Sequence, residues 1–139
     1  MLGGASSITI WAFVPLKPKD DWDTVKAFSK AASEHLAKVI PSLFSAVSGP
    51  NNRRGRIFVD YIRNNRGATT VAAFSVRARP GLGVSITCSW KEILTLTSGD
   101  HWNISNVRQR LESAEDPWAE YFKTKQVLSA ASKRKLNLK

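Results

Sequence analysis

Arginine side chains and one carboxylate are concentrated in the middle of this sequence. Seven of the ten arginines fall between Arg53 and Arg79, and Asp60 is the one acid among them. Guanidinium groups present N–H donors in a planar fork that matches phosphate oxygens. A carboxylate in such a segment either pairs with an arginine or ligates a hard divalent cation. The residue types of this segment are compatible with phosphate chemistry, with an ordinary charged surface and with an Asp60–arginine ion pair, and they leave all three open.

The whole chain is basic, with a formal net charge of +10 over 139 residues. Cations that neutralise phosphates release condensed counterions, so we expect a polyanionic partner, with nucleic acid first. No window approaches the roughly 20 apolar residues of a membrane-spanning helix, so we expect no membrane partner. Cys88 is the single cysteine, which excludes an internal disulfide. Because the start also lacks the pattern of a signal peptide, we expect a cytoplasmic protein.

The elements that must position these residues form an α+β pattern. The β-branched and aromatic run 8–15 predicts a buried strand. Apolar residues at helical spacing follow an Asp20 or Asp21 cap and predict a helix that ends at Pro41. Residues 57–62 predict a strand, and the turn signals at Asn64, Asn65 and Gly67 predict a hairpin to a second strand at 68–76. We therefore expect an antiparallel or mixed sheet with flanking helices.

The second half of the chain predicts short elements. Residues 84–89 favour a short strand, and Ser89 is a typical cap for a short helix. Two further helices are expected, one after Ser105 and one that starts at Pro117. We expect a single partial domain over residues 1–128, followed by a basic, frayed tail at 129–139.

One long run carries a family resemblance. Residues 55–80, GRIFVDYIRNNRGATTVAAFSVRARP, resemble a run near the end of bacterial ligase D polymerase domains, which are associated with an ATP-dependent DNA ligase. The segments VPLKPKDDWDTVKAFSKAASEHLA and PWAEYFKTKQ are similar to flanking parts of the same domain, so the resemblance covers residues 6–126. It implies the archaeo-eukaryotic primase-polymerase fold, of which this chain would be a partial, RRM-like half. Members of the family add nucleotides at broken DNA ends in the repair pathway of non-homologous end joining.

The resemblance also implies roles for individual residues. Asp60, in the VDY context, corresponds to the third carboxylate that holds catalytic Mg²⁺ or Mn²⁺. Arg53, Arg63, Arg77 and Arg79 correspond to positions around the incoming nucleotide triphosphate and the DNA. The implied activity is that of a DNA or RNA nucleotidyltransferase.

Two departures from the family pattern concern its active site. The family's Asp-x-Asp metal motif has no counterpart in suitable surroundings, because the run DDWD at 20–23 is expected to open a helix. Ile8 and Trp11 occupy positions where the family has a lysine and a histidine near the phosphates. We therefore expect no polymerase activity from the chain alone. The expected cofactor is the family's Mg²⁺ or Mn²⁺, or no metal ion at all. Structural roles are expected for His35 and His101, which lack partners at metal-ligand spacing.

Three functions remain open from the sequence. The first is a DNA- or nucleotide-phosphate-binding module of double-strand break repair with an incomplete, degenerate active site. The second is a non-catalytic protein-interaction module or homodimer derived from that fold. The third is an enzyme completed by a partner that supplies the missing carboxylates, with Asp60 as the third ligand.

Overall fold

The computed structural model describes residues 8–113 and 115–138. Contacts divide the chain into two compact units. Within the described residues, unit 1 comprises 8–15 and 71–124, and unit 2 comprises 16–70 and 125–138. The single domain expected over residues 1–128 stays a prediction.

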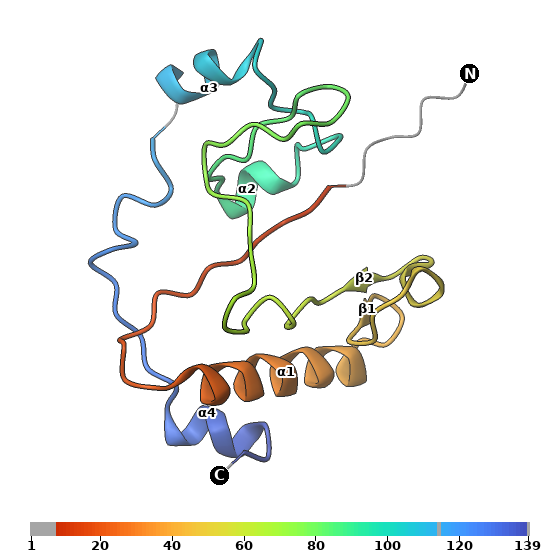
Figure 1. Ribbon diagram of the computed structural model, residues 1–139, viewed down its shortest axis with the longest axis vertical. Helices are drawn as coiled ribbons and strands as arrows, with labels where there is room; N and C mark the ends of the chain where they lie inside the picture. The colour runs from red at the N-terminus through yellow and green to blue at the C-terminus, as the bar shows by residue number, and fades with distance from the viewer. Residues whose placement is uncertain (1–7, 114, 139) are drawn as a thin grey trace. The chain divides into compact units, whose positions relative to one another are not determined.

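Unit 2 is built on helix α1, Trp22–Val39 (Figure 1). The side chain of Asp21 caps its N-terminus by accepting a hydrogen bond from the Thr24 backbone N–H at 2.8 Å. The helix stops before Pro41 because the residue that precedes a proline disfavours the helical conformation. The predicted helix is thus confirmed, and the run DDWD opens a helix as expected.

The sheet of unit 2 consists of two short strands, β1 (Phe44–Ser45) and β2 (Ile57–Phe58). They are parallel, and Phe44 pairs with Ile57. The crossover between them contains the 3₁₀ helix η1, Pro50–Arg53. The chain is α+β as predicted, but the expected antiparallel or mixed sheet is wrong.

The backbone hydrogen bonds explain this difference. The N–H groups of Ile57 and Val59 donate to the carbonyls of Leu43 and Ser45, at 2.7 and 2.9 Å. The expected partner strand 68–76 is instead divided between the two units. The predicted strand 57–62 therefore ends at Phe58, and the predicted hairpin does not form.

Helix α4, Ala130–Lys135, completes unit 2 and lies beside the start of α1 in Figure 1. The Ser129 side chain caps it, and Lys133 Nζ lies 3.3 Å from Asp20 Oδ1, on the segment that leads into α1. The sequence predicts a frayed tail at 129–139, whereas the described part of this segment contains the capped helix.

Unit 1 contains two helices, α2 (Trp90–Ile93) and α3 (Val107–Ser113), at the sites expected after Ser89 and Ser105. Isolated bridges join Val76 to Val84 and Gly83 to Asn103. Residues 84–89 form no strand beyond these bridges. The predicted strand 8–15 is also wrong, because this segment pairs with no other described strand and exposes much of its apolar surface.

The helix expected from Pro117 is replaced by consecutive turns. Asp116 Oδ1 accepts from the Trp118 backbone N–H at 2.9 Å, and the Tyr121 N–H donates to the Trp118 carbonyl at 2.8 Å. A three-residue separation of donor and acceptor is the hydrogen-bond pattern of a turn. Residues 117–123 therefore form turns in place of the predicted helix.

No hydrophobic residue among those described is buried. Several large side chains are almost fully open to solvent, including Trp90 at 78% exposure, Leu94 at 87% and Phe122 at 82%. Large apolar side chains exposed in this way are candidates for contact with a partner where they lie together in a patch. In the part of the chain that the structure describes, no helix has the length and apolar character needed to cross a membrane.

Candidate nucleic-acid interface

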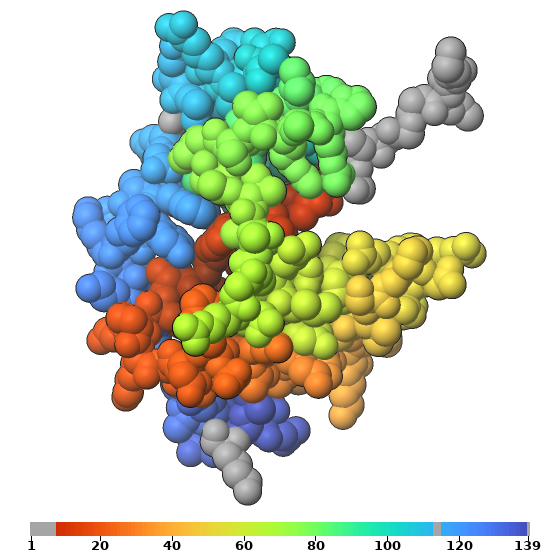
Figure 2. All heavy atoms as spheres, in the orientation of Figure 1, coloured from red at the N-terminus to blue at the C-terminus, as the bar shows by residue number. Residues whose placement is uncertain are grey.

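An open hollow lies on unit 2 beside β2, with a volume of about 380 Å³. The residues around it belong to the segment 48–68, which forms the yellow part of the surface in Figure 2. Polar and charged groups dominate its lining: Ser48, Arg53, Asp60, Arg63, Asn65 and Arg66. Three of the lining residues, Asp60, Arg53 and Arg63, are ones that the sequence singles out.

Asp60 follows β2 and makes two local contacts. Its Oδ1 atom accepts a hydrogen bond from the Ile62 backbone N–H at 2.9 Å. Its Oδ2 atom lies 3.6 Å from Arg63 Nε. The alternative that Asp60 pairs with a neighbouring arginine is therefore what the structure shows, and the short β2 lets Arg63 turn toward Asp60.

These contacts do not fit a divalent metal site. Mg²⁺ and Mn²⁺ take several oxygen ligands, commonly including more than one carboxylate. Within residues 8–113 and 115–138, no three histidine, cysteine or acidic side chains come together in a way that could hold a metal ion. The role of Asp60 as a metal ligand stays a prediction of the family resemblance.

The arginines at the hollow are held by different contacts. The Arg53 guanidinium carbon lies 4.7 Å from the centroid of the Phe58 ring, a cation–π contact that directs it over β2. Arg63 Nη1 donates to the Thr69 carbonyl at 3.1 Å. Arg66 also lines the hollow, although it is not among the positions that the family resemblance indicates. In the sequence, the position of Arg66 among the seven clustered arginines is the one feature that could have indicated its place at the hollow.

Arg77 and Arg79 belong to unit 1, so the structure does not place the four predicted arginines in one unit. They lie on a tight turn in which the Arg77 N–H donates to the Gly83 carbonyl at 2.8 Å and the Leu82 N–H donates to the Arg79 carbonyl at 2.9 Å. Gly81 in this turn has φ of +87°, a conformation that glycine adopts readily. The Arg79 side chain is exposed.

Trp11 is the first member of a chain of aromatic contacts in unit 1. Its ring centroid lies 6.5 Å from that of Phe13, which lies 5.2 Å from Trp118. Trp118 stacks on Tyr121 at 4.8 Å. These contacts give Trp11 a packing role, whereas Ile8 is exposed. The loss of a phosphate-binding histidine and lysine at these two positions stays a prediction.

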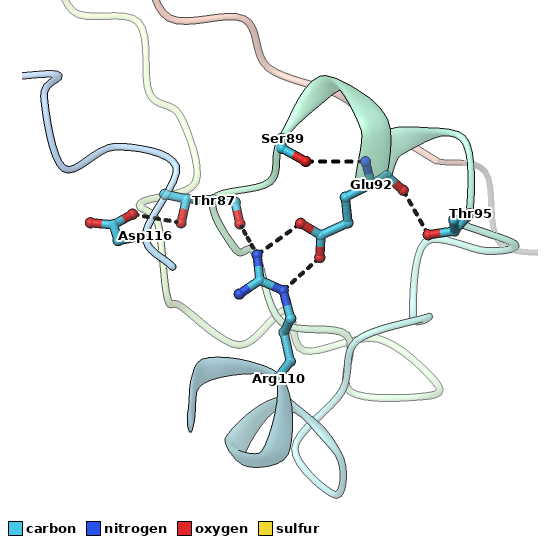
Figure 3. A network of polar contacts seen from close by, with 6 residues as sticks. All are labelled: Thr87, Ser89, Glu92, Thr95, Arg110 and Asp116. Carbon is cyan, nitrogen blue, oxygen red and sulfur yellow. Dashed lines mark hydrogen bonds and ion pairs between the residues drawn. The ribbon is translucent and has the colours of Figure 1, made fainter. Parts of the chain in front are cut away.

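A polar network that sequence reasoning missed links α2 and α3 (Figure 3). Arg110 Nε and Nη2 donate to the two carboxylate oxygens of Glu92, at 2.6 and 2.8 Å. Arg110 Nη2 also donates to the Thr87 carbonyl at 3.2 Å. The Arg110 side chain is only 8% exposed. This bidentate ion pair therefore joins the two helices in a place with little access to water.

A local capping bond fixes the backbone of Glu92, whose carboxylate is the acceptor in this network. The Ser89 hydroxyl accepts from the Glu92 backbone N–H at 3.2 Å, as in a capping box. The hydrogen bonds from Arg110 lower the pKa of Glu92, and the same pair raises the pKa of Arg110. Burial raises the pKa of the nearby Cys88 thiol, so this cysteine is a poor nucleophile at neutral pH.

The lowered pKa of Glu92 predicts a pH dependence of stability. A carboxyl group whose pKa falls on folding stabilises the fold above its ordinary pKa, here 4.5, and this contribution disappears as pH falls through the folded-state value. We expect the free energy of unfolding to fall more steeply with acidification in the wild type than in Glu92→Gln. Urea unfolding from neutral to acidic pH measures both slopes, and parallel curves would contradict the prediction.

Comparisons with known proteins agree over most of the chain. The family model described as the primase-polymerase domain of LigD matches residues 6–118. The multifunctional non-homologous end joining protein LigD of Pseudomonas aeruginosa is 53% identical over 88% of this chain and 15% of its own length. The bifunctional non-homologous end joining protein LigD of Bacillus subtilis is 21% identical over 84% of this chain and 19% of its length. The chain therefore spans less than a fifth of these relatives.

A solved structure has the same fold. The polymerase domain from Mycobacterium tuberculosis Ligase D, determined in complex with DNA, matches 81% of this chain and 39% of its own chain with a TM-score of 0.69. The sequence identity over this match is 22%, so the likeness shows a shared fold.

Proposed function

The chain belongs to the LigD primase-polymerase domain family, and on this basis we propose that it binds DNA or nucleotide phosphates in non-homologous end joining without polymerising alone. The observation that carries the proposal is the hollow of unit 2, whose lining includes Arg53, Arg63 and Arg66 and a single acidic residue, Asp60. Guanidinium groups gathered at a concave surface favour phosphate oxygens. The net charge of +10 favours the same class of partner.

Two further observations support DNA as the ligand. The M. tuberculosis polymerase domain of the same fold was solved with DNA. Arg77 and Arg79 add two cations on a turn of unit 1, and the Arg79 side chain is free to reach a phosphate because it is exposed. We propose that these two arginines contact the DNA backbone, which positions a protein on the duplex without reading its sequence.

The proposed lack of polymerase activity rests on the chemistry of the site. Two-metal phosphoryl transfer requires carboxylates that hold the ions against both the attacking and the leaving oxygens. Among the described residues, Asp60 is the only carboxylate that lines the hollow, and Asp21, in the run DDWD, is occupied as the cap of α1. We therefore propose that the chain alone holds no catalytic metal pair.

The salt dependence of DNA binding tests this function. We expect a labelled duplex with a recessed, 5′-phosphorylated end to bind with a slope of log K against log salt of about −0.9 for every phosphate contacted. Fluorescence polarisation from about 50 to about 200 mM salt measures the slope. A primer-extension assay with Mn²⁺ should show no product. Absence of binding at low salt would contradict the proposal.

A second candidate function rests on a different observation. Because no described hydrophobic residue is buried and Trp90, Leu94 and Phe122 are exposed, the chain has apolar surface for a protein partner or for a second copy of itself. Light scattering after size-exclusion chromatography distinguishes the two functions. A dimer that persists at high salt and does not bind DNA would favour this candidate over the first.

A further inference from the structure

We propose that the outer edge of β2 in unit 2 binds a strand from a second polypeptide, which supplies the part of the polymerase domain that has no counterpart in this chain. The inference names a partner for the second candidate function and rests on that candidate, whereas it is independent of DNA binding. The strand pairing, the exposed apolar residues and the charge beside β2 support it.

One edge of β2 is open to pairing. The N–H groups of Ile57 and Val59 bond to β1, so Phe58 between them directs its N–H and its carbonyl toward the opposite edge. Among the residues that the structure describes, the sheet has two strands, and no isolated bridge involves Phe58. Unpaired backbone groups at the edge of a sheet are a template for an added strand.

The other side of the strand pair is covered by helix α1. The helix packs against β1, and β1 lies between α1 and β2 in Figure 1. Parallel strands occur almost only in sheets that other elements cover, and two strands alone are marginally stable. The outer edge of β2 is therefore the place at which the sheet of unit 2 can gain a strand.

Apolar residues are exposed around this strand pair. The Leu43 N–H donates to the Ile40 carbonyl at 3.1 Å, and the Ile57 N–H donates to the Leu43 carbonyl at 2.7 Å. The three residues are therefore neighbours between the end of α1 and β2. All three are exposed, and Ile57 on β2 itself is 62% exposed. Burial of such side chains by an added strand would contribute hydrophobic free energy that the chain alone lacks.

The length of the matched domain indicates what covers this surface. The chain covers 39% of the M. tuberculosis polymerase-domain chain that has the same fold, so the larger part of that domain has no counterpart here. A chain of 139 residues normally buries a hydrophobic core of its own, yet no hydrophobic residue among those described is buried. The remaining part of the domain is therefore the occupant that fits the exposed strand and its apolar neighbours.

The charge beside β2 disfavours a second copy of this chain as the occupant. Residues 53–66 contain five arginines and one aspartate, which give a formal charge of +4. Two such segments placed side by side would repel each other, whereas a strand that carries carboxylates would be attracted. We therefore expect a different polypeptide, with acidic side chains next to the paired strand.

Co-expression of the full chain with a segment of P. aeruginosa LigD tests the proposal. The segment is the part of that relative's polymerase domain that precedes the region 53% identical to this chain. Each polypeptide carries its own affinity tag. We expect the two to elute together after purification through both tags, in equal amounts by light scattering. A segment that stays insoluble, or that elutes without the chain, overturns the proposal.

Two substitutions in β2 test where the segment binds. Ile57→Lys should reduce the co-purified segment about tenfold or more, because it places a charge where apolar surface is to be buried. Phe58→Pro should act in the same direction, because it removes the outward N–H and none of the bonds to β1. Val127→Lys is the matched control, since Val127 is an exposed apolar residue of unit 2 outside the sheet. If Phe58→Pro lowers the helix content by circular dichroism, Ile57→Lys decides the test.

Hydrogen exchange gives a second readout of the same contact. The Phe58 amide should exchange rapidly in the free chain and slowly in the complex, because an added strand accepts its hydrogen bond. A Phe58 amide that stays unprotected in the complex overturns strand addition at β2. Equal losses of the segment in Ile57→Lys and Val127→Lys overturn it as well, since they show a general effect of charge.

The outcomes separate this inference from the proposed functions. A homodimer of the chain that takes up no segment overturns the inference and keeps the second candidate function. A chain that stays monomeric and takes up no segment overturns both. DNA binding by the free chain, measured by fluorescence polarisation in a separate sample, decides the first function whichever of these results is found.

Discussion

Replacement of Arg110 by alanine should lower the free energy of unfolding by about 3 kcal/mol, because it leaves the carboxylate of Glu92 without its partner in a mostly buried place. Arg110 is 8% exposed and donates to both carboxylate oxygens of Glu92 and to the Thr87 carbonyl. Alanine is a good helix former, so α3 itself is not weakened. Urea unfolding followed by tryptophan fluorescence measures the loss.

Arg108→Ala is the matched control for this experiment. Arg108 lies on the same helix and pairs with Glu112 at 2.8 Å, but its side chain is 88% exposed. An exposed ion pair of this kind contributes little, so the change should stay within about 0.5 kcal/mol. Equal losses for the two variants would contradict a special role for the buried pair.

A double variant separates the ion pair from simple packing. Because most of the loss in Arg110→Ala comes from an unpaired carboxylate, the change Glu92→Leu with Arg110→Met should destabilise less than the two single changes added together. Strictly additive losses would show that the two side chains stabilise unit 1 independently. At acidic pH, the difference between the double variant and the sum of the single variants should become smaller, since protonated Glu92 no longer carries the charge.

Helix starts could be predicted from the sequence because their signals are local. Asp21 caps α1 through the N–H of Thr24, three residues further on, and Ser89 caps α2 in the same way. Such a bond depends on residue type and short spacing alone. The predicted caps of α1 and α2 are therefore present, whereas residues 117–123 form turns where the sequence predicts a helix.

Strand pairing could not be predicted in the same way, because a strand is defined by a partner elsewhere in the chain. The run from Ile57 has the composition of a strand, but its N–H groups donate to Leu43 and Ser45, in a segment that shows no alternation. From the sequence, the following segment 68–76 is the expected partner because a turn signal precedes it. Turn residues indicate that the chain changes direction, but they do not identify which segment pairs with the strand.

In the candidate site, too, local features could be predicted from the sequence and long-range contacts could not. The resemblance of residues 55–80 to the family predicted phosphate chemistry for the arginines and Asp60, and Arg53, Asp60 and Arg63 do line one hollow. Their distribution over two units depends on long-range packing, as does the pairing of Arg110 with Glu92 across 18 positions of sequence. No spacing rule connects two residues so far apart on different helices.

Removal of both Arg77 and Arg79 should weaken DNA binding about 100-fold at moderate salt. Each charge-assisted contact to a phosphate contributes about 1.5 kcal/mol, and about 1.4 kcal/mol corresponds to a factor of ten. The slope of log K against log salt should also fall in magnitude by about 2, since two phosphates are no longer neutralised. Fluorescence polarisation of the labelled duplex gives both quantities.

The control must remove the same charge from the same unit. Lys91→Ala with Arg108→Ala takes two exposed cations from α2 and α3 and leaves the turn of Arg77 unchanged. A general effect of net charge would weaken binding equally in both double variants and would contradict the assignment. A specific contact requires a fixed backbone, and the hydrogen bonds from the N–H groups of Arg77 and Leu82 provide one by closing the turn. The arginine turn should therefore dominate the salt slope, while the control loses only the small, screened contribution of distant charges.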